Sequence, residues 1–362
     1  MPERQPSIVL LCGESGAATD AIQQYAHALA HALTGLGADA RVETASFHGG
    51  TAGTAQSIDD AVAPSDTVLM VQYNPFSFGR AGVALRFVRA MRRLRRRYPS
   101  LTLVVMCHET VVMNPGVRWA ALRQVHRAQL RALLRLADAV YVSVDAWRPY
   151  LEAHGAKDAA LLPVGSNLPD RRAQRDAARA ALDATDRLIV ATFSTGHPSH
   201  DDEIARRAVD AVVSVRPDTL VLSLGAGRQR LLEPGDDRER CPGHLPAHEL
   251  AAHLAAADML ISPFVDGIST RRGTVMAALQ HGVAVVGSVG PSTDPDLEAL
   301  VRGLPGAGRG GDWIPGTAAA LANDASLRDE QGRAGRSLYA ARYDWPVLAA
   351  RVLHDTGAAP AP

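Results

Sequence analysis

A polar loop between two apolar segments carries residue types that could bind a charged ligand. The loop follows the apolar run 259–262, and its polar residues are Asp266, Ser269, Thr270, Arg271 and Arg272. Gly273 and Thr274 then open a predicted helix of small residues. The first N–H groups of a helix favour an anion, and arginines add charge-assisted hydrogen bonds to a diphosphate. A capped helix with surface arginines is the alternative that this pattern leaves open.

Two polar residues stand just after an apolar run in the first half of the chain. The run 101–106 predicts a strand, and His108 and Glu109 follow it. Ligands of parallel α/β sheets bind outside the carboxyl ends of the strands. We therefore expect His108 and Glu109 in a functional site, with a plain polar strand terminus as the alternative.

The first apolar run, 7–12, ends in a short loop with two glycines. This loop reads Gly13, Glu14, Ser15 and Gly16. Glycines at such a place let a ligand approach the backbone closely, and a tight turn without a ligand is the alternative. Asn74 follows the next apolar run, and we expect it at the same end of the domain.

Short apolar runs alternate with amphipathic segments along the whole chain. The expected strands are 7–12, 67–72, 101–106, 139–144, 188–193, 219–224, 259–262 and 283–286. The expected helices are 22–33, 80–97, 117–136, 146–154, 201–215, 247–256 and 273–281. This alternation predicts parallel sheets with helices on both faces. The pattern breaks at 163–175, so we predict two domains, 1–165 and 176–343.

The composition limits the classes of protein to consider. A length of 362 residues favours two domains, and a formal net charge of zero gives no reason to expect a nucleic-acid partner. The three cysteines are too far apart for a zinc site or a disulfide framework, which favours a cytoplasmic location. No stretch approaches the roughly 18 apolar residues of a membrane helix.

Several segments occur in an order and spacing that resemble one known family. They are 134–167, 222–230, 243–263, the polar loop with its helix, and 343–353. Together they resemble the bacterial glycosyltransferase group 1 family, whose members are retaining enzymes of the GT-B fold. The resemblance implies two Rossmann-like doubly wound domains that face a central cleft. It also implies that the last helix, 344–357, packs back on the N-terminal domain.

The resemblance implies a function as well. Such an enzyme moves a hexose from a nucleoside-diphosphate sugar, bound mainly to the C-terminal domain, to an acceptor on the N-terminal domain. It needs no metal and no cofactor. The family's histidine near the donor sugar corresponds to His108, and the loop 13–16 corresponds to the acceptor side, where Asn74 and Glu109 are also expected.

Two departures from the family pattern change the expected donor site. The family's two glutamates, with seven residues between them, are replaced by Ser269 and Ala277, so Asp266 is the acid expected to contact the sugar. The family's arginine–lysine pair is also missing from the loop that holds Ser194, Thr195 and Gly196. We expect those three residues to contact the donor, and Arg271 and Arg272 to supply the missing positive charge.

One predicted helix is unusually basic. The segment 86–97 holds seven arginines, Arg86, Arg89, Arg92, Arg93, Arg95, Arg96 and Arg97, with apolar residues between them. A basic amphipathic helix can lie on anionic lipid, which would place the protein peripherally at the inner face of the membrane. A solvated helix face that covers the sheet is the alternative.

Two other functions stay open. A nucleotide-sugar epimerase on the same fold would bind the donor but no acceptor. A non-catalytic glycosyltransferase-like subunit would partner an active enzyme, and the missing glutamates and basic pair favour this second alternative.

Overall fold

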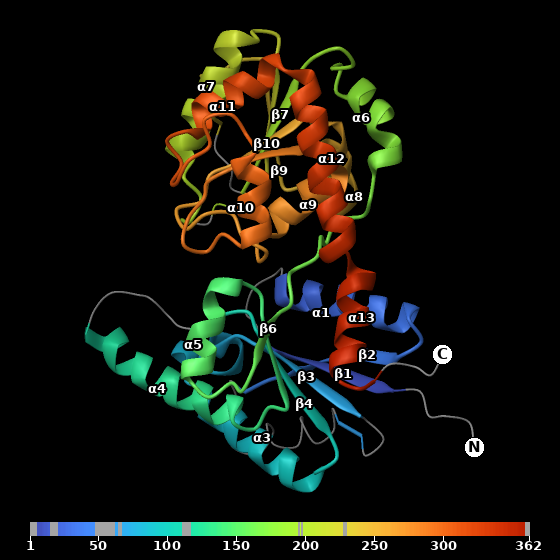
Figure 1. Cartoon of the computed structure of the whole chain (residues 1–362), viewed down its shortest axis with the longest axis vertical. Coiled ribbons are helices and arrows are strands. Elements are labelled where there is room, and N and C mark those ends of the chain that lie inside the picture. The colour runs from blue at the N-terminus through green and yellow to red at the C-terminus, as the bar shows by residue number, and fades with distance from the viewer. Residues whose placement is uncertain are drawn as a thin grey trace. The chain divides into compact units, whose positions relative to one another are not determined.

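The structure, a computed structural model, describes residues 6–14, 21–47, 62–63, 67–110, 117–194, 196, 198–226 and 230–358. The chain divides into two compact units (Figure 1). Unit 1 comprises Met1–Pro163 and Trp345–Pro362, and unit 2 comprises Val164–Asp344. No helix among these described ranges is long and apolar enough to cross a membrane.

Unit 1 is built on a parallel sheet whose described strands have the order β2-β1-β3-β4-β5-β6. The strands are β1 (Ser7–Gly13), β2 (Asp39–Ala45), β3 (Val68–Tyr73), β4 (Thr102–Cys107), β5 (Ala139–Val142) and β6 (Ala159–Leu161). The helices are α1 (Ala21–Gly35), α3 (Leu85–Arg97), α4 (Val117–Leu134), α5 (Arg148–Ala153) and α13 (Trp345–Asp355), with short 3₁₀ turns η1 (Pro75–Phe78), η2 (Arg80–Gly82) and η3 (Asp145–Trp147).

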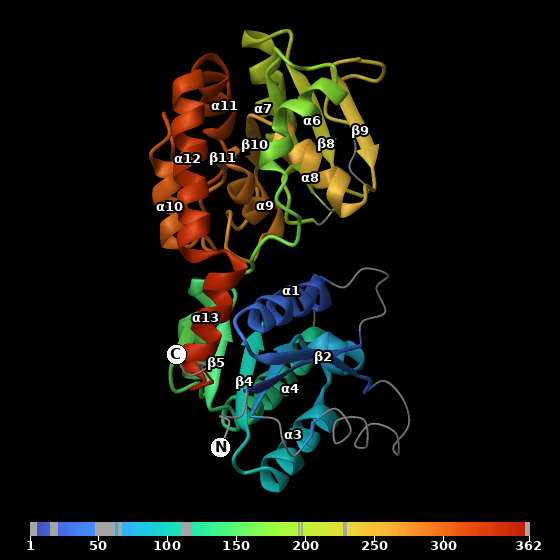
Figure 2. The ribbon, with the colours of Figure 1, turned by 90° about the vertical axis from the view of Figure 1, so that its right-hand side faces the viewer.

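Helices cover both faces of this sheet. The helices α1 and α13 pack against each other on one face, and α3 and α4 lie on the other (Figure 2). Every residue of β1 and β3 is therefore buried. This explains why these strands read as continuous apolar runs rather than as alternating patterns.

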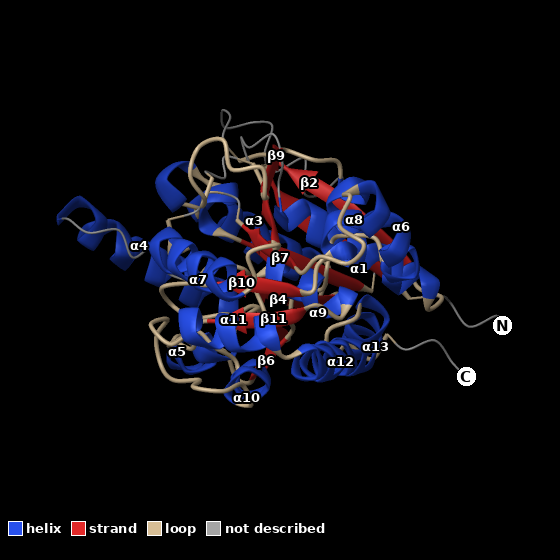
Figure 3. Ribbon diagram, turned by 90° about the horizontal axis from the view of Figure 1, so that it is seen from above, coloured by secondary structure: helices blue, strands red, loops and turns tan. Residues whose placement is uncertain are grey.

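Unit 2 is built on a second parallel sheet, with the described order β11-β10-β7-β8-β9. The strands are β7 (Ile189–Phe193), β8 (Leu220–Leu224), β9 (Glu239–Gly243), β10 (Met259–Ser262) and β11 (Ala284–Gly287). The helices are α6 (Arg175–Ala181), α7 (Asp202–Val215), α8 (Ala247–Ala256), α9 (Gly273–His281), α10 (Pro295–Arg302), α11 (Ile314–Asn323) and α12 (Ala325–Arg342), with the 3₁₀ turn η4 (Arg172–Gln174). Figure 3 shows each sheet flanked by helices.

The strand orders locate the point in each sheet where the chain reverses direction. In unit 1 the chain leaves β1 toward β2 and later continues on the other side, from β3. In unit 2 it runs from β7 toward β9 and then returns to β10 on the other side of β7. Open α/β sheets bind ligands at the carboxyl ends of the strands at such a point. The β1/β3 and β7/β10 ends are therefore the places to look for a site.

The helix that the sequence predicts at 80–97 begins only at Leu85. Before it the chain turns twice, because Ala81 and Gly82 have positive φ values of 51° and 74°. Buried Gln129 of α4 holds this turn, since its side chain accepts from the Ala84 N–H and donates to the Gly82 carbonyl. Tertiary hydrogen bonds thus override the helical pattern at these residues.

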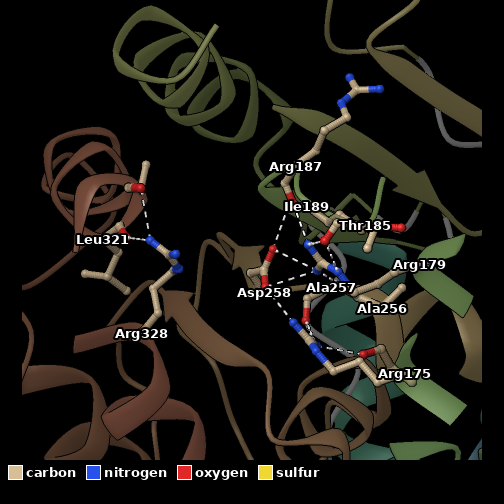
Figure 4. A network of polar contacts seen from close by, with 12 residues as sticks. Arg175, Arg179, Thr185, Arg187, Ile189, Ala256, Ala257, Asp258, Leu321 and Arg328 are labelled. Atoms are coloured by element: carbon tan, nitrogen blue, oxygen red, sulfur yellow. Dashed lines mark hydrogen bonds and ion pairs between the residues drawn. The ribbon is translucent and has the colours of Figure 1, made fainter. Parts of the chain in front are cut away.

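The segment 163–175, predicted as a linker, is attached to unit 2 over most of its length. The Val164 N–H donates to the Thr270 carbonyl at 2.9 Å, and the Arg171 N–H donates to His281 Nε2 at 3.3 Å. Arg175 and Arg179 of α6 then both bond the carboxylate of Asp258 and nearby carbonyls (Figure 4). Asp258 in turn accepts from the Ile189 N–H at 2.7 Å, which fastens α6 to the amino edge of the sheet.

Candidate functional site

The loop from β10 to α9 is held by the segment that follows β11. The hydrogen bonds between them include Phe264 N–H to Ser288 Oγ, the Ser288 hydroxyl to Phe264 O, Ile268 N–H to Ser288 O, Ser292 N–H to Asp266 O, and Thr270 N–H to the buried Asp294 carboxylate. The backbone of the loop is therefore fixed along its length, and its polar side chains start from defined positions.

Two glycines make this close packing possible. Gly267 has a φ of +89°, and a Cβ there would lie 2.2 Å from Thr293 Oγ1 and 2.4 Å from Gly290 N. A Cβ on Gly290 would lie 2.6 Å from the backbone of Asp266. Any side chain at either position would push the two segments apart.

Both arginines of the loop bind the same carboxylate. Arg272 Nη2 lies 2.6 Å from Asp266 Oδ1, and Arg271 Nη2 lies 3.1 Å from Asp266 Oδ2. Arg272 also donates to Ser199 Oγ at 3.0 Å and lies over the ring of Phe264, 4.1 Å from its centroid. The two positive charges are thus brought together as the sequence predicts, but each already has an anionic partner.

The ionisation of Asp266 follows from this environment. Burial raises the pKa of its carboxyl group, but the charges of Arg272 and Arg271 and the hydrogen bond from Arg272 outweigh burial. The pKa of Asp266 is therefore lower than its ordinary value, and the carboxylate is ionised at neutral pH.

The start of α9 lies directly after the two arginines. Arg272 is the N-cap residue, and its side chain makes no capping hydrogen bond to the helix. Among the described residues, no acceptor is found for the N–H groups of Gly273 and Thr274. Ser269 is fully buried, and its hydroxyl has no hydrogen-bond partner among the described residues. The helix start can therefore offer backbone donors to an anion.

The loop after β7 pairs with the loop after β10. The Val265 N–H donates to Ser199 O at 2.9 Å, and the Asp201 N–H donates to Pro263 O at 2.8 Å. Ser194 and Gly196 lie at the start of this loop, where the Gly196 N–H donates to Ser194 Oγ at 3.1 Å. Thr195, the third residue expected here, lies outside the described residues.

The carboxyl edge of the unit 1 sheet holds the other predicted residues. His108, at the end of β4, lies with Nε2 2.8 Å from Gln72 Oε1, and its ring meets Tyr25 edge-on at 4.9 Å between centroids. Gln72 is fully buried, and its amide nitrogen has no acceptor within the described parts of the chain. Glu109 is partly exposed beside His108.

The remaining predicted residues of unit 1 make structural contacts. A Cβ on Gly13 would lie 2.4 Å from Ser77 O, so this glycine allows η1 to approach β1. The Glu14 N–H donates to Ala45 O at 3.2 Å. Asn74 Oδ1 caps η1 by accepting from the Phe76 N–H at 3.0 Å. Ser15 and Gly16 lie outside the described residues.

Sequence reasoning missed several residues that hold these side chains in place. Gln72 is the one amide side chain of the strand VLMVQY, and this exception in an apolar strand could have identified it from the sequence. Ser199 and Phe264, which contact Arg272, gave none, because they come from two loops whose pairing is set by the fold. Over the described ranges there is no group of three His, Cys, Asp or Glu side chains that could hold a metal ion.

Solved structures similar to this chain share its fold over almost the full length. The HepE protein of Anabaena, in complex with UDP and glucose, has a TM-score of 0.67 at 14% identity, covering 98% of this chain and 100% of that chain. A sucrose-phosphate synthase from Thermosynechococcus elongatus has a TM-score of 0.68 at 17% identity, covering 97% and 98%. WaaG, a glycosyltransferase involved in lipopolysaccharide biosynthesis, has a TM-score of 0.63 at 13% identity, covering 95% and 98%.

These neighbours are GT-B glycosyltransferases, so the predicted fold class is confirmed: the chain has the GT-B fold. No protein-family model matches the chain, and no curated protein matches it in sequence.

Proposed function

We propose that this protein is a glycosyltransferase that binds a nucleoside-diphosphate sugar on unit 2. The observation that carries the proposal is the arrangement after β10, where the start of α9 follows a carboxylate that holds two arginines. It lies at the β7/β10 ends, the place where open α/β sheets bind ligands. The structural neighbour in complex with UDP and glucose supports this ligand class.

The proposed chemistry is stabilisation of a leaving diphosphate. When the bond between sugar and diphosphate breaks, negative charge grows on the phosphate oxygens. The N–H groups of Gly273 and Thr274 and the guanidinium groups of Arg271 and Arg272 would bind those oxygens, and donors fixed in advance stabilise the transition state most. Ser194, Thr195, Gly196, Ser269 and Thr270 belong to the same proposed donor site.

The finer assignments follow the family resemblance. We propose transfer of a hexose with retention of configuration, with His108 contacting the sugar and the carboxyl edge of the unit 1 sheet receiving the acceptor. Asp266 is proposed to contact a sugar hydroxyl, which would require that one of its ion pairs with Arg271 or Arg272 opens. No metal or cofactor is part of the proposal.

The test replaces each loop arginine. Hydrogen bonds to charged groups are worth about 1.5–3 kcal/mol, so Arg271→Ala or Arg272→Ala should weaken binding of UDP, GDP or ADP about tenfold or more. Binding of the matching nucleoside should change little. The lysine variants should recover only part of the affinity, because lysine lacks the bidentate fork. Arg207→Ala, an exposed arginine of α7, is the control.

Calorimetric titration of these variants would measure the affinities, and a panel of nucleotide sugars would measure turnover. If both alanine variants bind diphosphates as tightly as the wild type, the loop is not the donor site. Donor binding without transfer or hydrolysis, even with a partner protein present, would favour the non-catalytic subunit instead. An isomerised sugar would indicate an epimerase.

A further inference from the structure

One part of unit 1 has a strongly one-sided charge. Residues 80–137 contain thirteen arginines and a single acid, Glu109, which gives this segment a formal charge of +12 in a chain whose total is zero. The segment comprises α3 and α4, which pack side by side on the same face of the sheet. The remaining residues therefore carry the compensating negative charge.

The arginines of this segment lie mostly at the surface. The exposed ones on α3 are Arg86, Arg89, Arg92, Arg93, Arg96 and Arg97, and those at the end of α4 are Arg131 and Arg135. Arg123 and Arg127 are partly exposed. Neither helix contains an acidic residue, and Arg95 of α3 pairs instead with Asp138, just beyond the segment, at 2.6 Å.

A helix of unit 2 shows what a solvated face of this protein looks like. In α7, Arg206 pairs with Glu203 at 2.7 Å and with Asp210 at 3.0 Å. Arginines three or four positions apart on α3 instead repel one another, which destabilises the helix. The one-sided charge of α3 and α4 therefore differs from an ordinary solvated face and indicates an anionic partner.

Apolar side chains border the basic surface at the carboxyl edge of the sheet. Phe76 in η1 is 40% exposed and Leu85 at the start of α3 is 42% exposed. The ring of Phe76 lies 6.3 Å from that of His126 in α4. In α4, the apolar side that is buried at Leu130 and Leu133 continues through Leu122 and Trp119, which are only partly covered.

Figures 1 and 3 show why this end of α4 is less covered. The first turns of the helix extend past the sheet, so the sheet cannot bury their apolar side. Arg123 and Arg127 flank that apolar side at helical spacing. An apolar stripe bordered by arginines is the pattern of a helix that lies in the interface of an anionic bilayer.

We propose that α3 and α4 form a docking surface for an anionic lipid bilayer. Their arginines bind the lipid phosphates, and Phe76, Leu85 and Trp119 insert into the interface. The apolar border favours a membrane over a nucleic acid, because a duplex offers no apolar layer for these side chains. The proposal goes beyond sugar transfer and does not depend on it.

The experiment measures co-sedimentation of the full chain with vesicles. Wild-type protein should bind vesicles of phosphatidylcholine and phosphatidylglycerol, and it should bind phosphatidylcholine vesicles weakly. The triple variant Arg89→Glu, Arg93→Glu, Arg96→Glu should lower binding to anionic vesicles by more than about tenfold. High salt should weaken the wild type, since it screens exposed charges.

Two further variants distinguish binding through this surface from an effect of the protein's net charge. Arg207→Glu, Arg302→Glu, Arg333→Glu makes the same charge change on exposed residues of unit 2, and it should bind anionic vesicles as the wild type does. Phe76→Ala with Trp119→Ala should weaken binding that remains at high salt. Equal losses in both triple variants, no preference for anionic lipid, or binding to duplex DNA in place of vesicles would overturn the proposal.

Discussion

At the scale of single residues, the most informative side chain is Asp266. It is the acid nearest to the position where the family has a glutamate, and both of its oxygens accept from arginines. A bound diphosphate would compete with this carboxylate for the same guanidinium groups. The ion pairs are only partly exposed, with 12–26% of each side chain accessible, so breaking them for a diphosphate would cost free energy.

This competition predicts the effect of Asp266→Asn. Ion pairs near the surface are each worth about 0.2–1 kcal/mol, so removing two of them should raise the affinity for inorganic pyrophosphate by roughly two- to thirtyfold. Titration calorimetry would measure the change, with Asp312→Asn as the control because Asp312 is 92% exposed on the surface of the same unit. A loss of affinity would show that Asp266 acts mainly by holding the arginines in place.

The positions of the candidate residues at the ends of the strands were predictable from the sequence, but their contacts were not. The arginine pair and His108 follow from residue type and position in the strand–loop–helix order. That Asp266 would engage both arginines follows only from the turn at Gly267, which folds the loop back on itself. Gln72 and Ser199, which hydrogen-bond His108 and Arg272, lie in segments far from them in the sequence.

At the scale of elements, the site depends on the close approach of two loops. The β10–α9 loop meets the segment after β11 at Gly267 and Gly290, where backbone atoms occupy the space that a Cβ would need. The approach fixes the start of α9, because Thr270 is bonded to Asp294 just before the helix.

Gly267→Ala should therefore lower both stability and diphosphate affinity. The added methyl group meets Thr293 Oγ1 and Gly290 N, and the residue must also keep a φ of +89°. Gly235→Ala is the matched control, since Gly235 has a φ of +91° and nothing lies within 4 Å of its added Cβ. Chemical denaturation should show that the free energy of unfolding falls by about 1 kcal/mol in the control, because of the φ strain alone. In Gly267→Ala it should fall by several kcal/mol, because the added methyl group also clashes with its neighbours. Similar losses would mean that the two loops can separate freely.

Most elements were predictable because their apolar patterns are strong. The strands β1, β3, β4, β7, β8 and β10 match the expected runs to within a residue or two, since both faces of each sheet are covered. The edge strands β2, β6 and β9 were missed, because buried residues mix along them with partly or fully exposed ones. The helices α10, α11 and α12 were also missed, since they lie in a segment rich in glycine and small residues.

At the scale of the whole molecule, unit 1 is made from both ends of the chain. The final helix α13 buries Leu348, Ala349, Val352 and Leu353, and it packs on α1. Asp355 accepts a hydrogen bond from the Tyr141 hydroxyl at 2.9 Å, and the ring of Trp345 lies 5.3 Å from that of Tyr25. The first and last parts of the chain are thus one folding unit.

Deleting the chain after Asp344 should therefore unfold unit 1 and leave unit 2 folded. Each large apolar side chain of α13 contributes about 1.5–3 kcal/mol when buried, and the lost total approaches the stability of an ordinary domain. Limited proteolysis should cut residues 1–163 rapidly and spare unit 2. A deletion after Ala358 is the control, because it keeps α13. Equal resistance of both truncated proteins would contradict this account.

In the proposed donor site, the pairing of Asp266 with Arg271 and Arg272 would also select among anions. A carboxylate in the same loop is present at an effective concentration that few dissolved anions reach. Chloride or a single phosphate would gain too little to displace it. A ligand with two linked phosphates and further contacts would gain enough. The carboxylate would thus make the loop selective for polyvalent ligands over the abundant small anions around it.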